Sequence, residues 1–324
     1  MKDGKILSLQ TYSQIELHKP YGGVVPELAS RDHLEKLPLL FKDVINESGI
    51  LCDDIDLIAC TDSPGLIGSL LTGVMFAKGL SISLKKPIVF VNHLLAHVFT
   101  CNITHNLKEN FLCLLVSGGH SIIYDIGNIN DCKIIGQTID DSFGEVFDKI
   151  SKSLGFGYPG GPLIEKLAIF GDETAYKFSI PLKGKNLYDF SLSGIKTEFL
   201  KVINKIFERW SVPRGTSFEE IYDNLYYYKN SHLNGFASDV ANLCASFQYM
   251  VLKIVVDRLQ NALKNTKKHQ NFVLCGGVAS NKYIRKYLQK FCLDNGMNFY
   301  VPDAYLCTDN AAMVANCGAL TLNK

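Results

Sequence analysis

Two histidines four residues apart are the clearest candidates for chemistry in this sequence. His93 and His97 stand in the segment VNHLLAHVF. On a helix this spacing places both imidazoles on one face, one turn apart, where they can share a metal ion. The alternative is that both rings only pack in the protein interior. Because leucine and alanine separate the two histidines, the glutamate that acts as general base in HExxH proteases is missing, and peptide hydrolysis is disfavoured.

A third candidate ligand stands far along the chain. Asp309 precedes a pattern of small residues typical of a helix, in LCTDNAAMVANCGAL. Capping that helix is one sufficient explanation for an aspartate at this place. The alternative is that its carboxylate completes a set of two histidines and one carboxylate, which suits iron or zinc with open coordination positions.

Glycine pairs mark a second kind of candidate site. Three apolar segments are predicted to be buried strands that run into tight glycine-bearing loops, at residues 56–68, 111–119 and 271–277. Backbone N–H groups can approach a phosphate closely at Gly118-Gly119, Gly276-Gly277 and Gly160-Gly161. Any one pair can be a plain turn, but the three together favour one nucleotide cleft.

A run of carboxylates follows the second strand pattern. In IDDSFGEVFDK, Asp141, Glu145 and Asp148 fall along one stripe of a predicted helix. Such a stripe is ordinarily a solvated helix face. Near a nucleotide cleft, one of these carboxylates could instead accept hydrogen bonds from ribose hydroxyls.

The elements that would position these residues indicate an α/β protein. Helical patterns follow the first and third strands, whereas the second runs into SIIYDI, which alternates like a hairpin strand. A chain of 324 residues suits two lobes. The polar, tyrosine-rich stretch at 198–236 is expected to be a helical insertion on a lobe surface, followed by a long helix.

Composition excludes several classes of protein. Hydrophobic residues make up 47% and charged residues 20%, as in globular proteins. The net charge of +1 gives no bulk attraction for nucleic acid, so RNA contact must be local or shared with a partner. The ten cysteines form no CxxC pair, and there is neither a signal peptide pattern nor an apolar run of about 20 residues. We therefore expect a cytoplasmic protein without membrane contact.

Taken in order, these segments resemble the TsaD family, which transfers a threonylcarbamoyl group to tRNA. The resemblance covers nearly the whole chain, and the SGGH form is similar to the bacterial or organellar branch. It is carried by YGGVVPELASRDH (21–33), SPGLIGSLLTG (63–73), NHLLAH (92–97), LLVSGGH (114–120), DDSFGEVFDK (140–149), GYPGGP (157–162), DFSLSGIKT (189–197), CGGVASN (275–281) and CTDNAAM (307–313).

The resemblance implies a fold and a domain division. Members have the two-lobed α/β fold of actin, sugar kinases and heat-shock ATPases (ASKHA), with mixed sheets and the nucleotide in a cleft between the lobes. Lobe I is expected to contain residues 1–110, to be N-terminally incomplete, and to be completed by a C-terminal helix at 306–324. Lobe II is expected at 111–305, with the insertion at 198–236.

The resemblance also assigns site residues. His93, His97 and Asp309 would bind one divalent metal, usually iron in this family and possibly zinc. The threonylcarbamoyl-adenylate site would be lined by Leu115, Val116, Ser117, Gly118 and Gly119. Backbone amides of Ser117, Gly118 and Gly119 would stabilise developing charge. The adenosine and its ribose would be held by Asp148, Gly161 and Asn281.

The implied reaction moves the threonylcarbamoyl group from its adenylate to N6 of adenosine 37 in tRNAs that read ANN codons, releasing AMP. Expected partners are tRNA and homologues of TsaB and TsaE, with lysines between Lys183 and Lys205 as candidate tRNA contacts. Two other functions stay open: a non-catalytic ATP-binding scaffold, and a sugar kinase or ATPase of the same fold. For the kinase, the histidine and aspartate set would have no purpose.

One departure from the family pattern concerns the start of the chain. Family members carry a first strand and a phosphate loop resembling GIETSCDET before the stretch that aligns with TYSQ, and this sequence lacks that element. Either the true start lies upstream or the protein is degenerate. Because every later motif is intact, we favour an upstream start, and we expect the chain that begins at Met1 to be poorly active.

Overall fold

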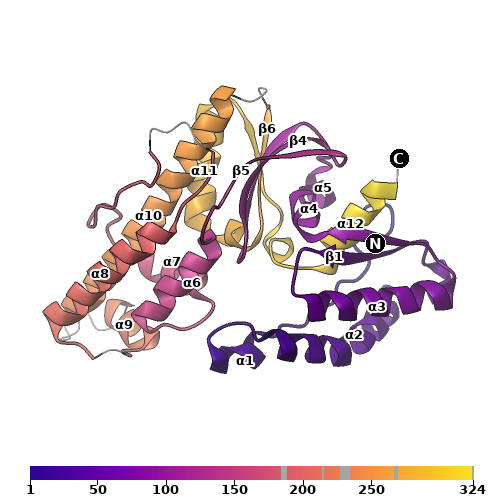
Figure 1. The fold of residues 1–324 in the computed structure, drawn as a ribbon, viewed down its shortest axis with the longest axis horizontal. Coiled ribbons are helices and arrows are strands. Elements are labelled where there is room, and N and C mark those ends of the chain that lie inside the picture. The colour runs from indigo at the N-terminus through magenta and orange to yellow at the C-terminus, as the bar shows by residue number, and fades with distance from the viewer. Residues whose placement is uncertain (184–187, 214, 227–233, 266–268, 323–324) are drawn as a thin grey trace. The chain divides into compact units, whose positions relative to one another are not determined.

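The chain folds into two compact units in a computed structural model (Figure 1). The model describes residues 1–324 except 184–187, 214, 227–233, 266–268 and 323–324. The first unit contains Met1–Asn110, Ile126–Cys132 and Tyr300–Lys324, and the second contains Phe111–Asp125 and Lys133–Phe299. The first unit is thus assembled from segments that are distant in the sequence. The expected division into lobe I (1–110 and 306–324) and lobe II (111–305) stays a prediction.

The first unit is built around two parallel strands. Their register pairs Ile58 with Ile88 and Thr61 with Val91. A helix joins the two strands, as a parallel pair requires. The elements of this unit are α1 (Ile15–His18), α2 (Pro26–Ser48), β1 (Ile58–Ser63), α3 (Ile67–Leu84), β2 (Ile88–Asn92), α4 (His93–Val98), α5 (Cys101–His105) and α12 (Ala311–Leu322).

Strand β1 is less buried than its sequence predicts. The segment was expected to be a buried strand, but its first four residues are half-buried and its last two are exposed. Helices α3 and α12 pack against β1. Within the described residues, however, its sheet has only two strands, so each strand keeps one edge without a neighbour, and that edge remains open. The prediction of a strand is confirmed and the prediction of burial is wrong.

Helix α12 returns from the end of the chain to this small sheet (Figure 1). An apolar cluster joins it to β2 and α4 through Val91, Ala96, Met313 and Cys317. Gly318 permits the close approach, because a Cβ atom there would lie 2.7 Å from the Ala59 Cβ. These contacts fix the segment that precedes α12 against the first unit.

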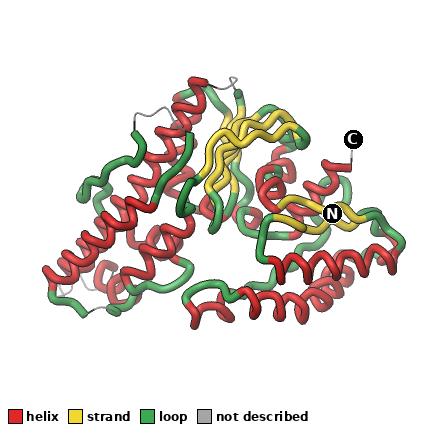
Figure 2. Tube along the Cα trace, in the orientation of Figure 1, coloured by secondary structure: helices red, strands yellow, loops and turns green. Residues whose placement is uncertain are grey.

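The second unit contains the larger sheet, shown as yellow strands in Figure 2. The strand order is β5-β4-β3-β6-β7, and β3 pairs in parallel with β6, with Leu115 opposite Cys275. All six residues of β3 are buried, as predicted. The strands are β3 (Phe111–Val116), β4 (Ser121–Asn128), β5 (Asp131–Gln137), β6 (Asn271–Cys275) and β7 (Asn298–Tyr300).

In the described residues, the second unit has six α-helices in addition to this sheet. The longest, α10, has 32 residues, most of them buried, and forms the centre of the helical layer. Helix α8 overlaps the stretch expected as a surface insertion, yet Phe199 and Ile203 in the shared part are fully buried. Part of that stretch, residues 214 and 227–233, lies outside the described residues. The helices are α6 (Phe143–Leu154), α7 (Gly160–Ala168), α8 (Ser193–Trp210), α9 (Phe218–Tyr226), α10 (Asn234–Asn265) and α11 (Lys282–Asp294).

The predicted carboxylate stripe is shorter than expected. Helix α6 begins at Phe143, because the Ser142 hydroxyl caps it by accepting a hydrogen bond from the Glu145 N–H. Asp141 therefore lies before the helix and not on its stripe. Its carboxylate forms an ion pair with Lys149 at 2.5 Å instead.

Two helices have the length and mean hydropathy that a membrane-crossing helix needs. Helix α10 is 72% buried over the relevant window, as the core helix of a folded unit would be, whereas α3 is 6% buried. This test rests on length and composition alone, so the expectation of no membrane contact stays a prediction.

Candidate functional site

The two histidines lie on one short helix at the end of a strand. Asn92 is the last residue of β2 and the N-cap of α4. Its side-chain oxygen accepts hydrogen bonds from the N–H groups of Leu94 and Leu95. This cap starts α4 at His93 and places His97 one turn later. The rings of His93 and His97 meet edge to face, with centroids 4.8 Å apart. The prediction that both imidazoles share one helix face is confirmed.

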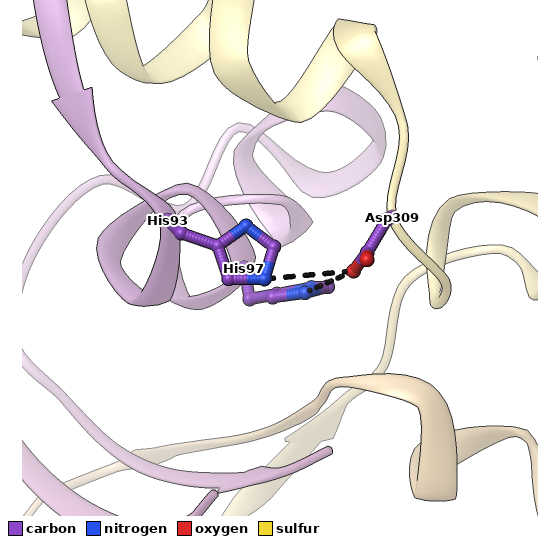
Figure 3. A group of neighbouring side chains, drawn as sticks. All are labelled: His93, His97 and Asp309. Atoms are coloured by element: carbon purple, nitrogen blue, oxygen red, sulfur yellow. Dashed lines mark hydrogen bonds and ion pairs between the residues drawn. The ribbon is translucent and has the colours of Figure 1, made fainter. Parts of the chain in front are cut away.

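Asp309 meets this pair from the segment before α12 (Figure 3). Its Oδ1 atom lies 3.1 Å from His97 Nε2 and 3.6 Å from His93 Nε2. The neighbouring Asn310, not Asp309, caps α12 by accepting a hydrogen bond from the Met313 N–H at 2.9 Å. The alternative that Asp309 is only a helix cap is therefore wrong, because its carboxylate contacts the two histidines instead.

The three side chains have the spacing of ligands to one ion. Their donor atoms all lie within 4.8 Å of one another. Two donors that bind one zinc or iron ion at about 2.1 Å lie about 3.0–3.4 Å apart, close to the separations between Asp309 and each histidine. Two imidazoles and one carboxylate also form a donor set that suits these metals. The residues present therefore fit a divalent metal.

Burial and charge differ among the three candidate ligands. The side chain of His97 is 1% exposed and that of Asp309 is 80% exposed. A hydrogen bond with His97 lowers the pKa of Asp309, and the nearby His93 and His97 act in the same direction. The Nδ1 atom of His97 is buried without a hydrogen-bond partner among the described residues. Packing, and not a second hydrogen bond, therefore orients this ring.

The Ser117–Gly119 loop is a tight turn at the end of β3. The Ser117 N–H donates to the His120 carbonyl at 2.8 Å, and the His120 N–H donates to the Ser117 hydroxyl at 3.2 Å. A Cβ atom built on Gly118 or Gly119 would meet no atom within 4 Å. The side chains of Leu115 and Val116 are buried in the sheet, so a ligand could meet only their backbone.

Two of the predicted adenosine contacts, Asp148 and Asn281, already form hydrogen bonds within the protein. One oxygen of Asp148 accepts a hydrogen bond from the Gly160 N–H at 2.7 Å. Burial raises the pKa of Asp148 against this hydrogen bond, and the charge of Glu145 adds to the rise. Gly161 borders open space. Asn281 is buried and caps α11 through its Oδ1, while its Nδ2 donates to Gln248 at 2.6 Å.

These segments are neighbours within the second unit. Helix α6, which carries Asp148, packs on α7 and on the short helix Gly277–Ser280. The same short helix contacts β3 and β6. A Cβ atom on Gly144 of α6 would lie 2.6 Å from the Gly118 Cα, so the helix touches the loop directly. The structure thus brings together the loop, Asp148, Gly161 and Asn281.

Sequence analysis missed three residues that support this region. Asp140 accepts hydrogen bonds from the Ser191 hydroxyl, the Leu192 N–H and the Ser193 hydroxyl at 2.7–3.0 Å. Gln248 holds Asn281, and nothing in the sequence marks it. Ser142 had a visible signal, because SFGE has the Ser-x-x-Glu pattern of a capping box.

Solved structures define the class of this fold. The chain superposes on a crystal structure of full-length HypF in its phosphate- and nucleotide-bound form, with a TM-score of 0.54 and 16% identity over 83% of this chain. A second match, HypF of T. kodakarensis, has a TM-score of 0.56 and 15% identity over 87% of this chain. The chain spans only 39% and 43% of those two proteins. At this identity the likeness establishes the fold alone, which is the predicted ASKHA fold.

Sequence comparison then gives the family. The profile of TsaD, described as tRNA N6-adenosine threonylcarbamoyltransferase, matches residues 5–316. Proteins of that name are 43% identical in Thermosipho africanus, over 98% of this chain and 88% of the relative, and 40% identical in Neorickettsia sennetsu, over 97% and 86%. The chain belongs to this family and is a transferase, as its motifs predicted.

Proposed function

We propose that this protein transfers a threonylcarbamoyl group from threonylcarbamoyl-adenylate to N6 of adenosine 37 in tRNAs that read ANN codons. The amine attacks the carbamoyl carbon, the bond from that carbon to the phosphate oxygen breaks, AMP leaves with the electron pair, and the proton that the amine loses is released to solvent. The observation that carries the proposal is the meeting of His97 and Asp309 across 212 residues of sequence, in a chain of the TsaD family. A scaffold that only bound nucleotide would not need this contact between His97 and Asp309.

His93, His97 and Asp309 are the proposed holders of one divalent metal, Fe²⁺ or Zn²⁺. A metal bound there would supply a Lewis acid and a template for the threonylcarbamoyl group. The two neutral imidazoles and one carboxylate would leave part of the coordination sphere open for substrate oxygens. The burial of His97 would keep its ring in one orientation.

The Leu115–Gly119 segment is the proposed site of the adenylate. Gly118 and Gly119 present their N–H groups without any hydrogen-bond acceptor among the described residues. Such amides can stabilise charge that develops on the carbamoyl and phosphate oxygens. Asp148, Gly161 and Asn281 are the proposed contacts to adenosine and ribose, with Asp148 using the oxygen that does not bind Gly160.

Helix α8 offers a surface for tRNA. Lys201, Lys205 and Arg209 follow each other at four-residue spacing and are exposed, so their charges lie along one face about 6 Å apart along the axis. Arg209 also pairs with Asp239 at 3.2 Å. Lys205 and Arg209 line an open cavity of 290 Å³ together with Val202 and Ile206. We assign this face to phosphate contacts, since the net charge of the chain provides no general attraction.

The partner proteins would cover exposed apolar surface. One stripe of α3 carries Ile67, Leu71, Met75 and Ile82, which are 57–83% exposed. Contiguous exposed apolar patches of this kind mark interaction sites. We propose that a TsaB homologue covers this stripe and that a TsaE homologue joins the assembly. All ten cysteines are free thiols, which supports a cytoplasmic location.

Reconstitution tests this function. The full chain, with TsaB and TsaE homologues, threonylcarbamoyl-adenylate and unmodified tRNA, should convert adenosine 37 to its threonylcarbamoyl form, measured by mass spectrometry of nucleosides. A tRNA with guanosine at that position is the control. Unmodified tRNA alongside full modification by the Thermosipho africanus relative would reject the proposal.

A further inference from the structure

A buried hydroxyl lies directly behind the glycine loop. Ser142 is 1% exposed, and its Oγ donates a hydrogen bond to the Gly118 carbonyl at 2.5 Å. The same Oγ accepts a hydrogen bond from the Glu145 N–H at 3.2 Å. A serine hydroxyl has one proton and two lone pairs. Its only proton is therefore committed to Gly118, while a lone pair caps α6.

This hydrogen bond determines where a neighbouring amide points. The carbonyl of Gly118 and the N–H of Gly119 belong to one planar peptide group, and in a trans peptide they point in opposite directions. Within the described chain only Ser63-Pro64 and Tyr158-Pro159 are cis. Because Ser142 draws the carbonyl toward α6, the Gly119 N–H points away from α6. A Cβ atom built on Gly118 or Gly119 would meet no atom within 4 Å, so there is room beside the loop for a ligand.

The two hydrogen bonds between Ser117 and His120 close the turn, but neither involves the peptide group that joins Gly118 to Gly119. Two consecutive glycines lack the side chains that restrict backbone rotation. Gly144 of α6 packs against Gly118, where a Cβ atom would lie 2.6 Å from the Gly118 Cα, and this contact limits the position of the loop. It supplies no hydrogen bond that would choose between the two directions of the peptide plane. That choice belongs to Ser142.

We propose that Ser142 is a positioning residue that keeps the Gly119 N–H directed at an oxygen of the bound adenylate. The inference rests on the proposed function, because it takes the adenylate as the ligand of this loop. A donor held in place before the reaction needs no reorganisation when charge develops. Loss of the Ser142 proton should therefore lower kcat by about 10- to 100-fold, with a smaller effect on KM for the adenylate.

Four substitutions separate this role from helix capping. Ser142→Asp keeps a good cap acceptor for the Glu145 N–H, but a carboxylate has no proton for Gly118 and repels its carbonyl. Ser142→Thr keeps both hydrogen bonds and should restore activity. Ser142→Ala removes both and should cost about 1 kcal/mol of stability, so the protein stays folded. Glu145→Gln keeps the backbone N–H that bonds the Ser142 hydroxyl but removes a charge near Asp148, so it separates the effect of that charge from the loss of the Ser142 proton.

A second capping box provides the matched control. Ser217 and Glu220 at the start of α9 form the same pair of hydrogen bonds, at 2.8 Å and 3.1 Å. Ser217→Asp makes the same chemical change away from the loop. It should leave kcat unchanged.

The measurement is steady-state transfer by the full chain with its partner homologues, over a range of adenylate concentrations, together with thermal unfolding of each variant. We expect a fall in kcat for Ser142→Asp and Ser142→Ala, and recovery for Ser142→Thr. Equal kcat for Ser142→Ala and wild type overturns the inference, whether or not Ser142→Asp folds.

One further variant distinguishes the inference from the proposed function. Gly119→Ala adds a methyl group where no protein atom lies within 4 Å, so it impairs transfer only if a ligand occupies that space. Impaired Gly119→Ala with unimpaired Ser142→Ala rejects the positioning role and keeps the site. If neither variant is impaired, both the positioning role and the adenylate assignment of this loop are wrong.

Discussion

His97 is buried and Asp309 is exposed, although their side chains are in direct contact. The buried ring is held by packing on α4, whereas the carboxylate comes from the segment that the packing of α12 fixes against the first unit. The proposed metal ligands therefore depend on two separate contacts, one within α4 and one through α12.

Loss of either ligand should release the metal. We expect His97→Ala and Asp309→Ala to retain little bound iron or zinc, since loss of even a hydrogen-bond partner behind a ligand weakens binding by about 10- to 100-fold. The measurement is metal content by elemental analysis after anaerobic purification. His269, which pairs with Asp125 at 2.9 Å, provides the control, because His269→Ala removes a similar pair outside the proposed centre. Unchanged metal content in both ligand variants would reject the assignment.

These residues differ in how far the sequence alone predicts them. The four-residue spacing of His93 and His97 predicts a shared helix face by geometry. No local sequence pattern links them to Asp309, because 212 residues separate it from His97. Only the family resemblance assigned Asp309 to the same site as the two histidines. Gln248 could not be predicted, since its role depends on a tertiary contact with Asn281 that leaves no periodic pattern.

At the scale of elements, the start of α6 and the segment before α8 are tied together by Asp140. Burial alone would raise the pKa of Asp140, but hydrogen bonds from the Leu192 N–H and from the hydroxyls of Ser191 and Ser193 outweigh it and lower that pKa. A lowered carboxyl pKa stabilises the fold above the unfolded pKa of about 3.9, and this contribution is lost as pH falls through the folded pKa.

Asp140→Asn should therefore destabilise the protein in a pH-dependent way. We expect a loss of about 1 kcal/mol at pH 7, at the low end for bonds to a charged group because Asp140 is exposed. The difference from wild type should shrink as the pH falls through the folded pKa. Denaturant unfolding at several pH values measures this difference. A pH-independent difference for Asp140→Asn would contradict the assignment.

The approach of α12 to β1 gives a second prediction at this scale. Gly318→Ala would place a methyl group 2.7 Å from the Ala59 Cβ and should cost about 1–3 kcal/mol through overpacking. Gly79→Ala in α3, where no atom lies within 4 Å, should instead stabilise by up to about 1 kcal/mol through helix propensity. Thermal unfolding compares the two. Gly318→Ala as stable as wild type would show that α12 does not need this close contact.

Secondary structure was predicted correctly where a run of residues is continuously buried. It was predicted wrongly where a single side chain sets the start of a helix. The apolar runs of β3 and β6 predicted buried strands because both lie inside the larger sheet. The stripe that included Asp141 was wrong because the Ser142 cap starts the helix two residues later. The burial of β1 was wrong because hydrophobic residues alone do not reveal how many strands flank them.

At the scale of the whole molecule, the net charge of +1 makes tRNA binding depend on local cations. Lys201→Ala together with Lys205→Ala should weaken tRNA binding and reduce the slope of log affinity against log salt by about 1.5–2, one released counterion for each lost phosphate contact. Lys286→Ala with Lys290→Ala on α11 is the matched control. Titration of tRNA at several salt concentrations measures both slopes, and identical slopes would exclude α8 as the phosphate-binding face.

The first unit draws its last segment, Tyr300–Lys324, from the far end of the sequence, and this has a consequence for biosynthesis. A ribosome adds about 5–20 residues per second, so α4 emerges well before the segment that carries Asp309. Until translation has passed α12, the nascent chain holds two histidines without their carboxylate and an apolar surface of β2 and α4 without its cover. Loading of the proposed metal would therefore be a late event, and chaperones that shield apolar surface would act on this unit during the interval.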